Sequence, residues 1–76
     1  MNIENTLNQG ASILKKNKIP NPYLDSEILL SQSINKDKKY IILNSKEILS
    51  SNQLDKFNNF IVRRKNGEPI AYLTNK

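Results

Sequence analysis

Residues 63–73 carry the signals that end one helix and begin another, and they limit the possible folds of this sequence more than any other stretch. Three consecutive basic residues place positive charge where a helix macrodipole is negative, and Gly67 can adopt the left-handed conformation that stops a helix. Glu68 and Pro69 suit a new first turn, since proline fits the first helical position and a carboxylate favours the positive end. The stretch predicts a long helix, a turn and a short final helix over residues 68–73.

Upstream, apolar residues recur every three or four positions along residues 3–14, which is the spacing of one helical face. Gly10 weakens this helix by up to about 1 kcal/mol relative to alanine, so we expect it to mark close packing against a neighbour. Pro20 and Pro22 then interrupt the pattern, because each disfavours helical geometry in the residue before it. The breaks divide the chain into five predicted helices: Ile3–Lys16, Pro22 to about Ile34–Asn35, Lys38–Leu43, Ser51–Lys65 and 68–73.

Polar residues stand where the three longer helices are expected to begin. Asn2 or Asn5 can cap the first helix, and Asn21 precedes a proline at the first position of the second. Ser50 and Gln53 have the spacing of a capping box, in which each side chain accepts a hydrogen bond from the other residue's backbone N–H. We therefore expect a side-chain cap at each of these three N-termini.

Residues 40–43 (Tyr-Ile-Ile-Leu) allow two interpretations. Taken alone, β-branched and aromatic residues favour a strand. However, no other segment offers a partner strand, and a lone strand leaves its backbone groups unpaired. We therefore predict the short third helix.

Five helices with short connections predict an all-α fold, a small orthogonal bundle in a single domain over residues 1–76. On the second helix, Leu24, Ile28, Leu29 and Ile34 form the expected core-facing stripe, with Leu30 at its margin. The predicted core comprises Leu7, Ala11, Leu14, Leu24, Ile28, Leu29, Ile41, Leu54, Phe57, Ile61, Ile70 and Leu73.

The composition argues against several kinds of function. The chain has neither cysteine nor histidine, which removes disulfides, thiolate metal sites, and the commonest general base and metal ligand. We therefore expect no catalytic, cofactor-binding or metal-binding residue in these 76 residues. No apolar run approaches the roughly 20 residues that span a bilayer, and the N-terminus lacks the charged and apolar regions of a signal peptide. The expected location is the cytoplasm.

The formal net charge of +5 has two interpretations. An excess of basic residues is typical of proteins that bind nucleic acid. However, ten of the twelve basic residues are lysines, and lysine, asparagine and isoleucine all have A- and T-rich codons, so genome composition can account for much of the charge. The basic residues also cluster at predicted helix ends rather than along one face. This distribution argues against a helix-turn-helix domain that reads nucleic acid through its second and fourth helices, which we keep as the alternative interpretation.

Four residues near the C-terminus are candidates for contact with a partner or another domain: Arg63, Arg64, Glu68 and Tyr72. The arginines either bind helix-end carbonyls, with one of them paired to Glu68 or Asp25, or present their planar guanidinium groups to an acidic surface. Tyr72 has an apolar ring and a hydroxyl, which suits a half-buried site between domains; alternatively it packs in the core. Asp25 and the glutamate two residues after it point about 200° apart on a helix, so they suit local ion pairs and not a catalytic dyad.

The motif Arg-Arg-x-x-Gly-Glu-Pro-x-Ala-Tyr-Leu at residues 63–73 resembles the close of the N-terminal domain in bacterial release factor glutamine methyltransferases. Residues 21–30, Asn-Pro-Tyr-Leu-Asp-Ser-Glu-Ile-Leu-Leu, resemble the second helix of that domain, which usually contains Asp-Ala-Glu-Leu-Leu-Leu. Both motifs occur in the family's order and at about its spacing, and the resemblance covers essentially the whole chain. One departure is Asn75, where the family usually has glycine; asparagine tolerates left-handed geometry, so we expect the turn into a linker to be kept.

The resemblance implies a docking role in an enzyme whose catalytic domain is not in this chain. Family members transfer a methyl group from S-adenosylmethionine to the glutamine of a release factor's Gly-Gly-Gln motif. Their cofactor and their Asn-Pro-Pro-Tyr loop belong to a C-terminal methyltransferase domain, and the Asn-Pro-Tyr at residues 21–23 is a helix start rather than that loop. The implied partners are the release factor and the protein's own methyltransferase domain, to which we expect a linker beyond Lys76 to lead. A third interpretation is a module that only stabilises its neighbour.

Overall fold

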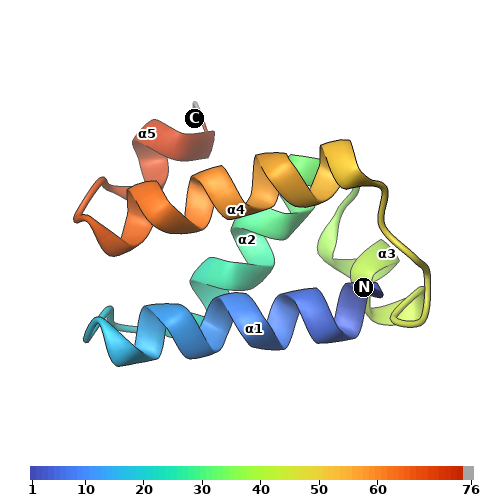
Figure 1. Cartoon of the computed structure of the whole chain (residues 1–76), viewed down its shortest axis with the longest axis horizontal. Coiled ribbons are helices and arrows are strands. Elements are labelled where there is room, and N and C mark those ends of the chain that lie inside the picture. The colour runs from blue at the N-terminus through green and yellow to red at the C-terminus, as the bar shows by residue number, and fades with distance from the viewer. Residues whose placement is uncertain (75–76) are drawn as a thin grey trace.

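Five helices form over residues 1–74, the part of the chain that the computed structural model describes. They are α1 (Ile3–Lys16), α2 (Pro22–Ile34), α3 (Lys38–Leu43), α4 (Ser51–Lys65) and α5 (Ile70–Thr74) (Figure 1). The described residues contain no strand, only an isolated antiparallel bridge between Asn2 and Ile48. The all-α prediction is confirmed, and residues 40–43 are helical. The turn expected at Asn75 lies outside the described residues.

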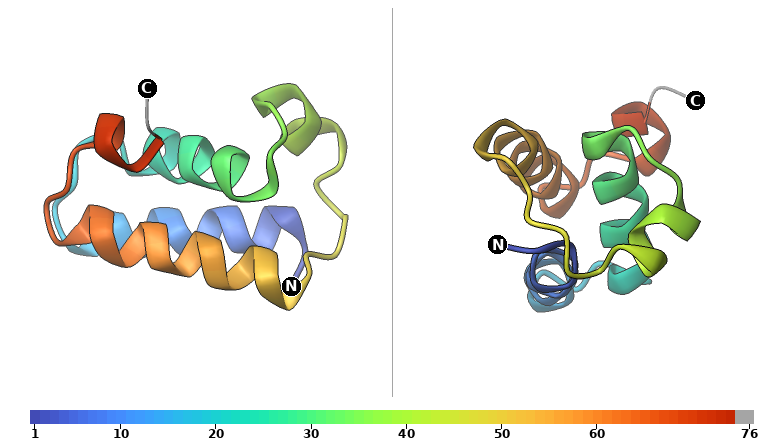
Figure 2. Two further views of the ribbon diagram at one scale, coloured as in Figure 1. Left: turned by 90° about the horizontal axis from the view of Figure 1, so that it is seen from above. Right: turned by 90° about the vertical axis from the view of Figure 1, so that its right-hand side faces the viewer.

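The second helix is the centre of the bundle. α1 and α4 run in the same direction and contact each other, while α2 runs back across both in the opposite sense (Figures 1 and 2). α2 contacts each of the other four helices. The two short helices, α3 and α5, lie toward opposite ends of the molecule's longest axis (Figure 2, left).

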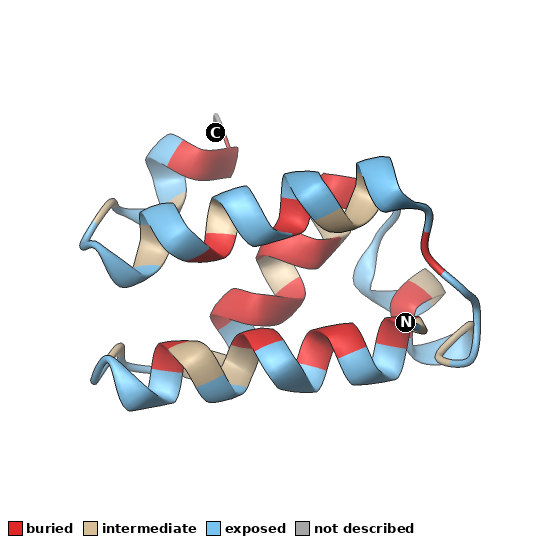
Figure 3. Ribbon diagram, in the orientation of Figure 1, coloured by how far each residue is buried: buried red, intermediate tan, exposed pale blue. Residues whose placement is uncertain are grey.

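The core forms where α1, α2 and α4 meet, with their buried residues turned toward one another (Figure 3). Four residues of the predicted core, Ala11, Ile28, Leu54 and Ile70, are only partly buried. The buried apolar residues are Ile3, Leu7, Leu14, Leu29, Leu30, Ile34, Ile41, Leu49, Phe57, Ile61 and Leu73.

The stripe predicted on α2 is wrong at its edges. Leu24 is 42% exposed, whereas Leu30, expected at the margin, is fully buried. A single apolar stripe describes a helix that lies on the surface of a core, but α2 is covered on most sides. Polar residues such as Asp25, Ser26 and Ser33 are therefore buried along it together with the leucines.

Gly10 marks the closest approach of α1 to its neighbours, as predicted. A Cβ added at this position would lie 2.5 Å from Cζ of Phe57 on α4 and 2.6 Å from Oγ of Ser26 on α2. The Ser26 hydroxyl in turn donates a buried hydrogen bond of 2.8 Å to the backbone carbonyl of Leu7. Three helices thus meet at a position where only glycine fits.

Two of the three predicted N-terminal caps are confirmed. The Asn2 side chain accepts from the backbone of the third residue of α1 at 2.7 Å, and Ser50 with Gln53 forms the expected capping box. Asn21 does not act as a side-chain cap on α2. Its backbone is left-handed (φ 55°), whereas a capping side chain needs the extended conformation to reach the first turn.

Candidate functional site

Arg64 joins three parts of the fold through one side chain. Its Nε donates to the carboxylate of Asp25 on α2 at 2.9 Å, and the two side chains are only 17% and 10% exposed. Its Nη1 donates to the backbone carbonyl of Glu68 at 3.1 Å. The predicted local ion pair is confirmed, and it fixes the end of α4 against α2 and against the turn that leads to α5.

That turn is a Schellman motif centred on Gly67, whose φ is +101°. The Gly67 N–H donates to the carbonyl of Arg64 at 3.0 Å, and the Glu68 N–H donates to the carbonyl of Arg63 at 3.2 Å. The carboxylate of Glu68 also pairs with the guanidinium of Arg63. Because Glu68 closes this motif, α5 begins at Ile70 and not at Glu68, which corrects the predicted start.

Tyr72 is 78% exposed, so the interpretation that it packs in the core is wrong. Its neighbours Leu73 and Thr74 are buried, and α5 contacts α2 and α4. A helix of five residues cannot persist alone in water, so this packing and the Arg64 contacts hold it in place. The helix therefore presents a tyrosine ring to solvent from a fixed backbone, and contact of that ring with another domain stays a prediction.

The carboxylates on α2 serve local pairing. Asp25 is paired with Arg64, and Glu27 is paired with Lys38 at 3.4 Å, as expected from their spacing. Across residues 1–74, no cluster of carboxylate, histidine or cysteine side chains is placed to hold a metal ion. No helix within the same residues has the length and apolarity needed to cross a membrane.

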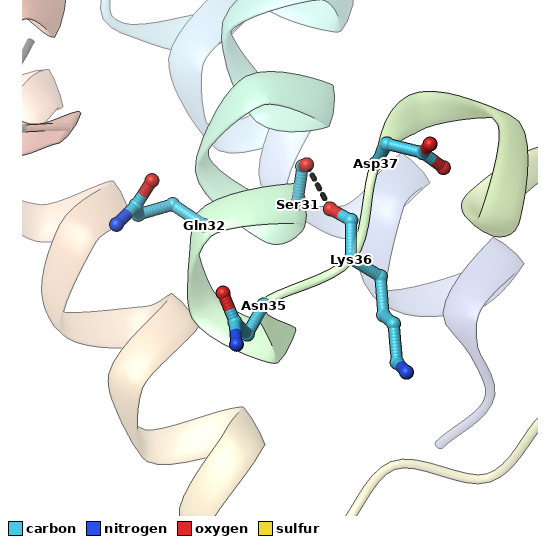
Figure 4. Close-up of a pocket in the computed structure, with 5 residues that line it drawn as sticks. All are labelled: Ser31, Gln32, Asn35, Lys36 and Asp37. Atoms are coloured by element: carbon cyan, nitrogen blue, oxygen red, sulfur yellow. Dashed lines mark hydrogen bonds between the residues drawn. The ribbon is translucent and has the colours of Figure 1, made fainter.

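A shallow polar hollow of about 310 Å³ opens where α2 ends and the chain turns into α3 (Figure 4). It is lined by Ser31, Gln32, Asn35, Lys36 and Asp37. The Ser31 hydroxyl donates to the Lys36 carbonyl, and the Asp37 carboxylate caps α3. Gln32 and Asp37 point away from each other in Figure 4. These polar groups therefore close a turn and do not converge on a bound molecule.

A second feature is apolar, and we call it the α3 edge: Tyr23, Ile42, Leu43 and Ile48. These side chains are 51%, 67%, 70% and 71% exposed. Tyr23 and Ile42 also line a hollow of about 220 Å³ between α1, α2 and α3. The sequence analysis placed Ile41 in the core but made no prediction about the exposure of Ile42 and Leu43. The signal was present, since a six-residue helix has one buried face and cannot bury three consecutive apolar residues.

Tyr40 fastens this edge to the following loop. Its hydroxyl donates to the Glu47 carboxylate, and the ammonium of Lys36 lies 5.0 Å from its ring centroid. The hydrogen bond to Glu47 is the main cause that raises the pKa of the Tyr40 hydroxyl, and desolvation and the Glu47 charge add to it. The backbone carbonyls of Ser45 and Glu47 each accept, at 2.9 Å, one of the first two N–H groups of α1.

The nucleic-acid interpretation loses one of its two reading helices. All 13 residues of α2 are described, and only Tyr23, Leu24 and Gln32 among them are exposed. A reading helix must place a row of polar side chains in a groove of the duplex. α2 is instead the centre of the core and offers no such row.

Comparison with known proteins finds that the PrmC N-terminal domain family matches residues 5–74. The chain belongs to this family. It is 43% identical over 76 residues to the release factor glutamine methyltransferase of Buchnera aphidicola subsp. Schizaphis graminum, covering 100% of this chain and 27% of that protein. It is 37% identical over 71 residues to a bifunctional methyltransferase of Rickettsia bellii, covering 93% of this chain and 13% of that protein.

A third relative, the release factor glutamine methyltransferase of Clostridium acetobutylicum, is 34% identical over 76 residues, with the whole chain aligned to 27% of that protein. The chain thus spans about a quarter or less of the length of these curated relatives. No solved structure matches it.

The two motifs that carry the resemblance to this family meet in space. Asp25 belongs to the motif at residues 21–30 and Arg64 to the motif at residues 63–73, and these two side chains form the largely buried ion pair. In this chain the two motifs therefore meet at a junction of α2, α4 and α5.

Proposed function

We propose that this chain is the substrate-docking domain of a release factor glutamine methyltransferase. The observation that carries the proposal is the match to the PrmC N-terminal domain family over residues 5–74. Relatives that align with the whole chain bear that enzyme name. Since the chain spans about a quarter of those relatives, the methyl transfer belongs to the remainder of the protein.

In the proposed reaction, the side-chain amide nitrogen of the glutamine in a release factor's Gly-Gly-Gln motif gains the methyl group of S-adenosylmethionine and loses a proton, and S-adenosylhomocysteine is released. The cofactor is held by the methyltransferase domain. The PrmC N-terminal domain contributes binding and no chemistry, in keeping with a sequence that lacks histidine and cysteine. Because its substrate acts in translation, we place the protein in the cytoplasm.

Docking would accelerate the reaction by proximity. A surface that binds the release factor away from the reacting glutamine can use that binding energy to orient the Gly-Gly-Gln loop in the catalytic site. Such positioning requires a rigid connection between the docking surface and the catalytic domain. The Arg64 contacts with Asp25 and Glu68 make the turn before α5 rigid by joining it to α2.

We assign the contact with the methyltransferase domain to α5. Tyr72 is 78% exposed and lies two residues before Thr74, the last residue that the structure describes. A tyrosine ring with a free hydroxyl suits an interface that is half apolar and half wet. Arg63, Arg64 and Glu68 would act behind it, by holding the turn from which α5 starts.

An NMR titration of the ¹⁵N-labelled chain tests the docking role. We expect a release factor to shift amide signals on one face, and a short DNA duplex to leave the spectrum unchanged at physiological salt. Signals that respond to DNA alone, with an effect that fades steeply as salt rises, would favour the nucleic-acid alternative. A chain that responds to neither probe would act by stabilising its neighbour, and the docking proposal would then be abandoned.

A further inference from the structure

The turn between α4 and α5 (Figure 1) contains a pair of residues that can react without an enzyme. Asn66 is the only one of the twelve asparagines that is followed by glycine. In such a pair the backbone nitrogen of the glycine can attack the side-chain carbonyl carbon, Cγ, of the asparagine, and the missing Cβ of glycine leaves that nitrogen unhindered. Both residues are exposed, and nothing lies within 4 Å of a Cβ built at Gly67. Solvent therefore reaches the reacting atoms.

The side chain of Asn66 is not engaged in the fold, unlike those of two other asparagines at helix ends. Asn17 and Asn44, the C-caps of α1 and α3, donate their side-chain amides to backbone carbonyls one turn earlier, at 2.8 and 3.0 Å. Asn66 is the C-cap of α4, and no hydrogen bond to another residue of 1–74 holds its side chain. Its carboxamide is therefore free to rotate toward the glycine.

The folded turn keeps the attacking nitrogen away from this carboxamide. The Gly67 N–H donates to the Arg64 carbonyl at 3.0 Å. The ψ angle of Asn66 is 3°, which places the Gly67 nitrogen close to the backbone nitrogen of Asn66 and away from its Cβ. A five-membered ring through Cβ and Cγ needs the opposite arrangement, so the turn must open before the ring can close. The reaction rate therefore depends on how often the turn opens.

We propose that Asn66 is a site of spontaneous deamidation, and that opening of the turn at Gly67 sets its rate. The Gly67 nitrogen loses its proton and bonds to Cγ of Asn66, and ammonia leaves, which gives a cyclic succinimide. Water then adds to either carbonyl of the ring and breaks one of its C–N bonds, which gives aspartate or isoaspartate at position 66. The net change is the gain of one water and the loss of one ammonia, so no oxidant or reductant is needed.

The isoaspartate product would loosen the junction of α4 and α5. In isoaspartate the main chain runs through Cβ and Cγ, so one more carbon separates the Arg64 carbonyl from the Gly67 N–H, and their hydrogen bond loses its geometry. The new carboxylate also lies at the C-terminal end of α4, where the macrodipole disfavours an anion. A five-residue α5 depends on this turn for its position, so we expect it to become more mobile.

The test incubates the 76-residue chain in ¹⁸O-labelled water at mildly alkaline pH, digests it in ordinary water and locates the label by mass spectrometry. We expect label at residue 66 before any other asparagine. The rate should be at least about fivefold lower than in a synthetic peptide of residues 60–72, which is too short to form the turn stably. The reaction needs neither a release factor nor a methyltransferase domain, so its outcome does not depend on the proposed function.

Two variants test the control by the turn. Arg64→Met removes the contacts with Asp25 and with the Glu68 carbonyl, and should raise the rate by at least about threefold. Lys65→Met is the matched control, because it removes an equal charge beside Asn66 from an exposed residue that forms no ion pair within residues 1–74. It should keep the parent rate, and circular dichroism checks that both variants remain folded.

A third variant separates the effect of the new charge from that of the extra backbone carbon. Asn66→Asp carries the charge of the product on an ordinary main chain. We expect amide exchange in α5 to be faster in the isoaspartate form of the chain than in this variant.

The alternative outcomes lead to different conclusions. A folded chain that gains no label at residue 66 over many half-lives of the peptide reaction would overturn the site. Equal rates in the folded chain and the peptide would overturn the control by the turn, and this comparison stands even if Arg64→Met fails to fold. Equal rates in the two folded methionine variants would count against the same control.

Discussion

Replacing Gly10 by alanine tests the packing at the centre of the bundle. The new Cβ would lie 2.5 Å from Cζ of Phe57 and 2.6 Å from Oγ of Ser26, well inside the contact distance of about 3.5–4.0 Å between carbon atoms. Neither atom can retreat easily. Phe57 is 1% exposed and enclosed by the core, and Ser26 is held by its 2.8 Å hydrogen bond to the Leu7 carbonyl.

Two opposing terms set the size of the effect. Alanine improves helix propensity by about 1 kcal/mol relative to glycine. Overpacking costs about 1–3 kcal/mol, and we take the upper end because α2 and α4 must both move away from α1. The free energy of unfolding should therefore fall by about 2 kcal/mol, out of the roughly 4–11 kcal/mol typical of a domain of this length. The melting temperature should fall by about 8–16 °C.

Thermal and urea unfolding followed by circular dichroism measure this loss. Ser12→Ala, at an exposed position on the same helix, is the control and should leave stability unchanged or slightly higher. Ser26→Ala removes one of the three clashing atoms, so its combination with Gly10→Ala should cost less than the sum of the single substitutions. A Gly10→Ala chain as stable as the parent would refute the idea that α1 needs glycine where the helices cross.

Three further predictions concern the two ends of the bundle. Arg64→Met leaves the largely buried Asp25 carboxylate without its cation and should lower the free energy of unfolding, measured in urea titrations, by about 2–3 kcal/mol. Adding Asp25→Asn to this variant should restore most of the loss. No loss in Arg64→Met would mean that the pair is incidental. Gly67→Ala forces a side chain to φ +101° and should cost about 1–3 kcal/mol, with faster amide exchange in α5 than in α1; unchanged exchange would count against the Schellman turn as the support of α5. Tyr40 should lose its proton above its ordinary pKa of 10.0, because its hydrogen bond to Glu47 favours the neutral hydroxyl. That hydrogen bond stabilises the fold below about pH 10 and is lost as pH rises through the raised pKa. Glu47→Gln should therefore lower the midpoint pH in an NMR titration of the Tyr40 ring. An unmoved midpoint would contradict the assigned cause.

Local signals made the helix boundaries predictable. The Ser50–Gln53 capping box, Pro20 and Pro22 at the start of α2, and the left-handed Gly67 each act within a few residues, and their physical effect does not depend on the rest of the fold. Asn21 shows the limit of such signals. Its residue type suits a cap, but its left-handed backbone belongs to the turn that brings α2 back against α1, and that turn depends on tertiary packing.

Non-local packing accounts for what sequence reasoning missed. Leu24 and Leu30 exchange their expected roles because α2 has neighbours on most sides, which no helical period encodes. The exposure of Tyr72 could not be predicted because α5 has only five residues, of which only Leu73 and Thr74 are buried. The sequence left open whether an arginine pairs with Asp25 or with Glu68, and both pairs form: Arg63 with Glu68 within the turn, and Arg64 with Asp25 because α4 crosses α2.

The two ends of the bundle differ in what they leave exposed. At the α5 end, the side chain of Arg64 and the turn at Gly67 fix the backbone while Tyr72 stays outside, which suits a junction with a covalently attached neighbour. At the α3 end, the Tyr40–Glu47 hydrogen bond and the bridge between Asn2 and Ile48 hold the backbone, and apolar side chains stay exposed. α2 contacts both α3 and α5, so one helix connects the two ends. Under the proposed docking function, loosening the Asp25–Arg64 junction should impair methylation of the release factor by the whole enzyme while leaving the affinity for the release factor unchanged. An equal loss of both would show that the junction does not transmit position.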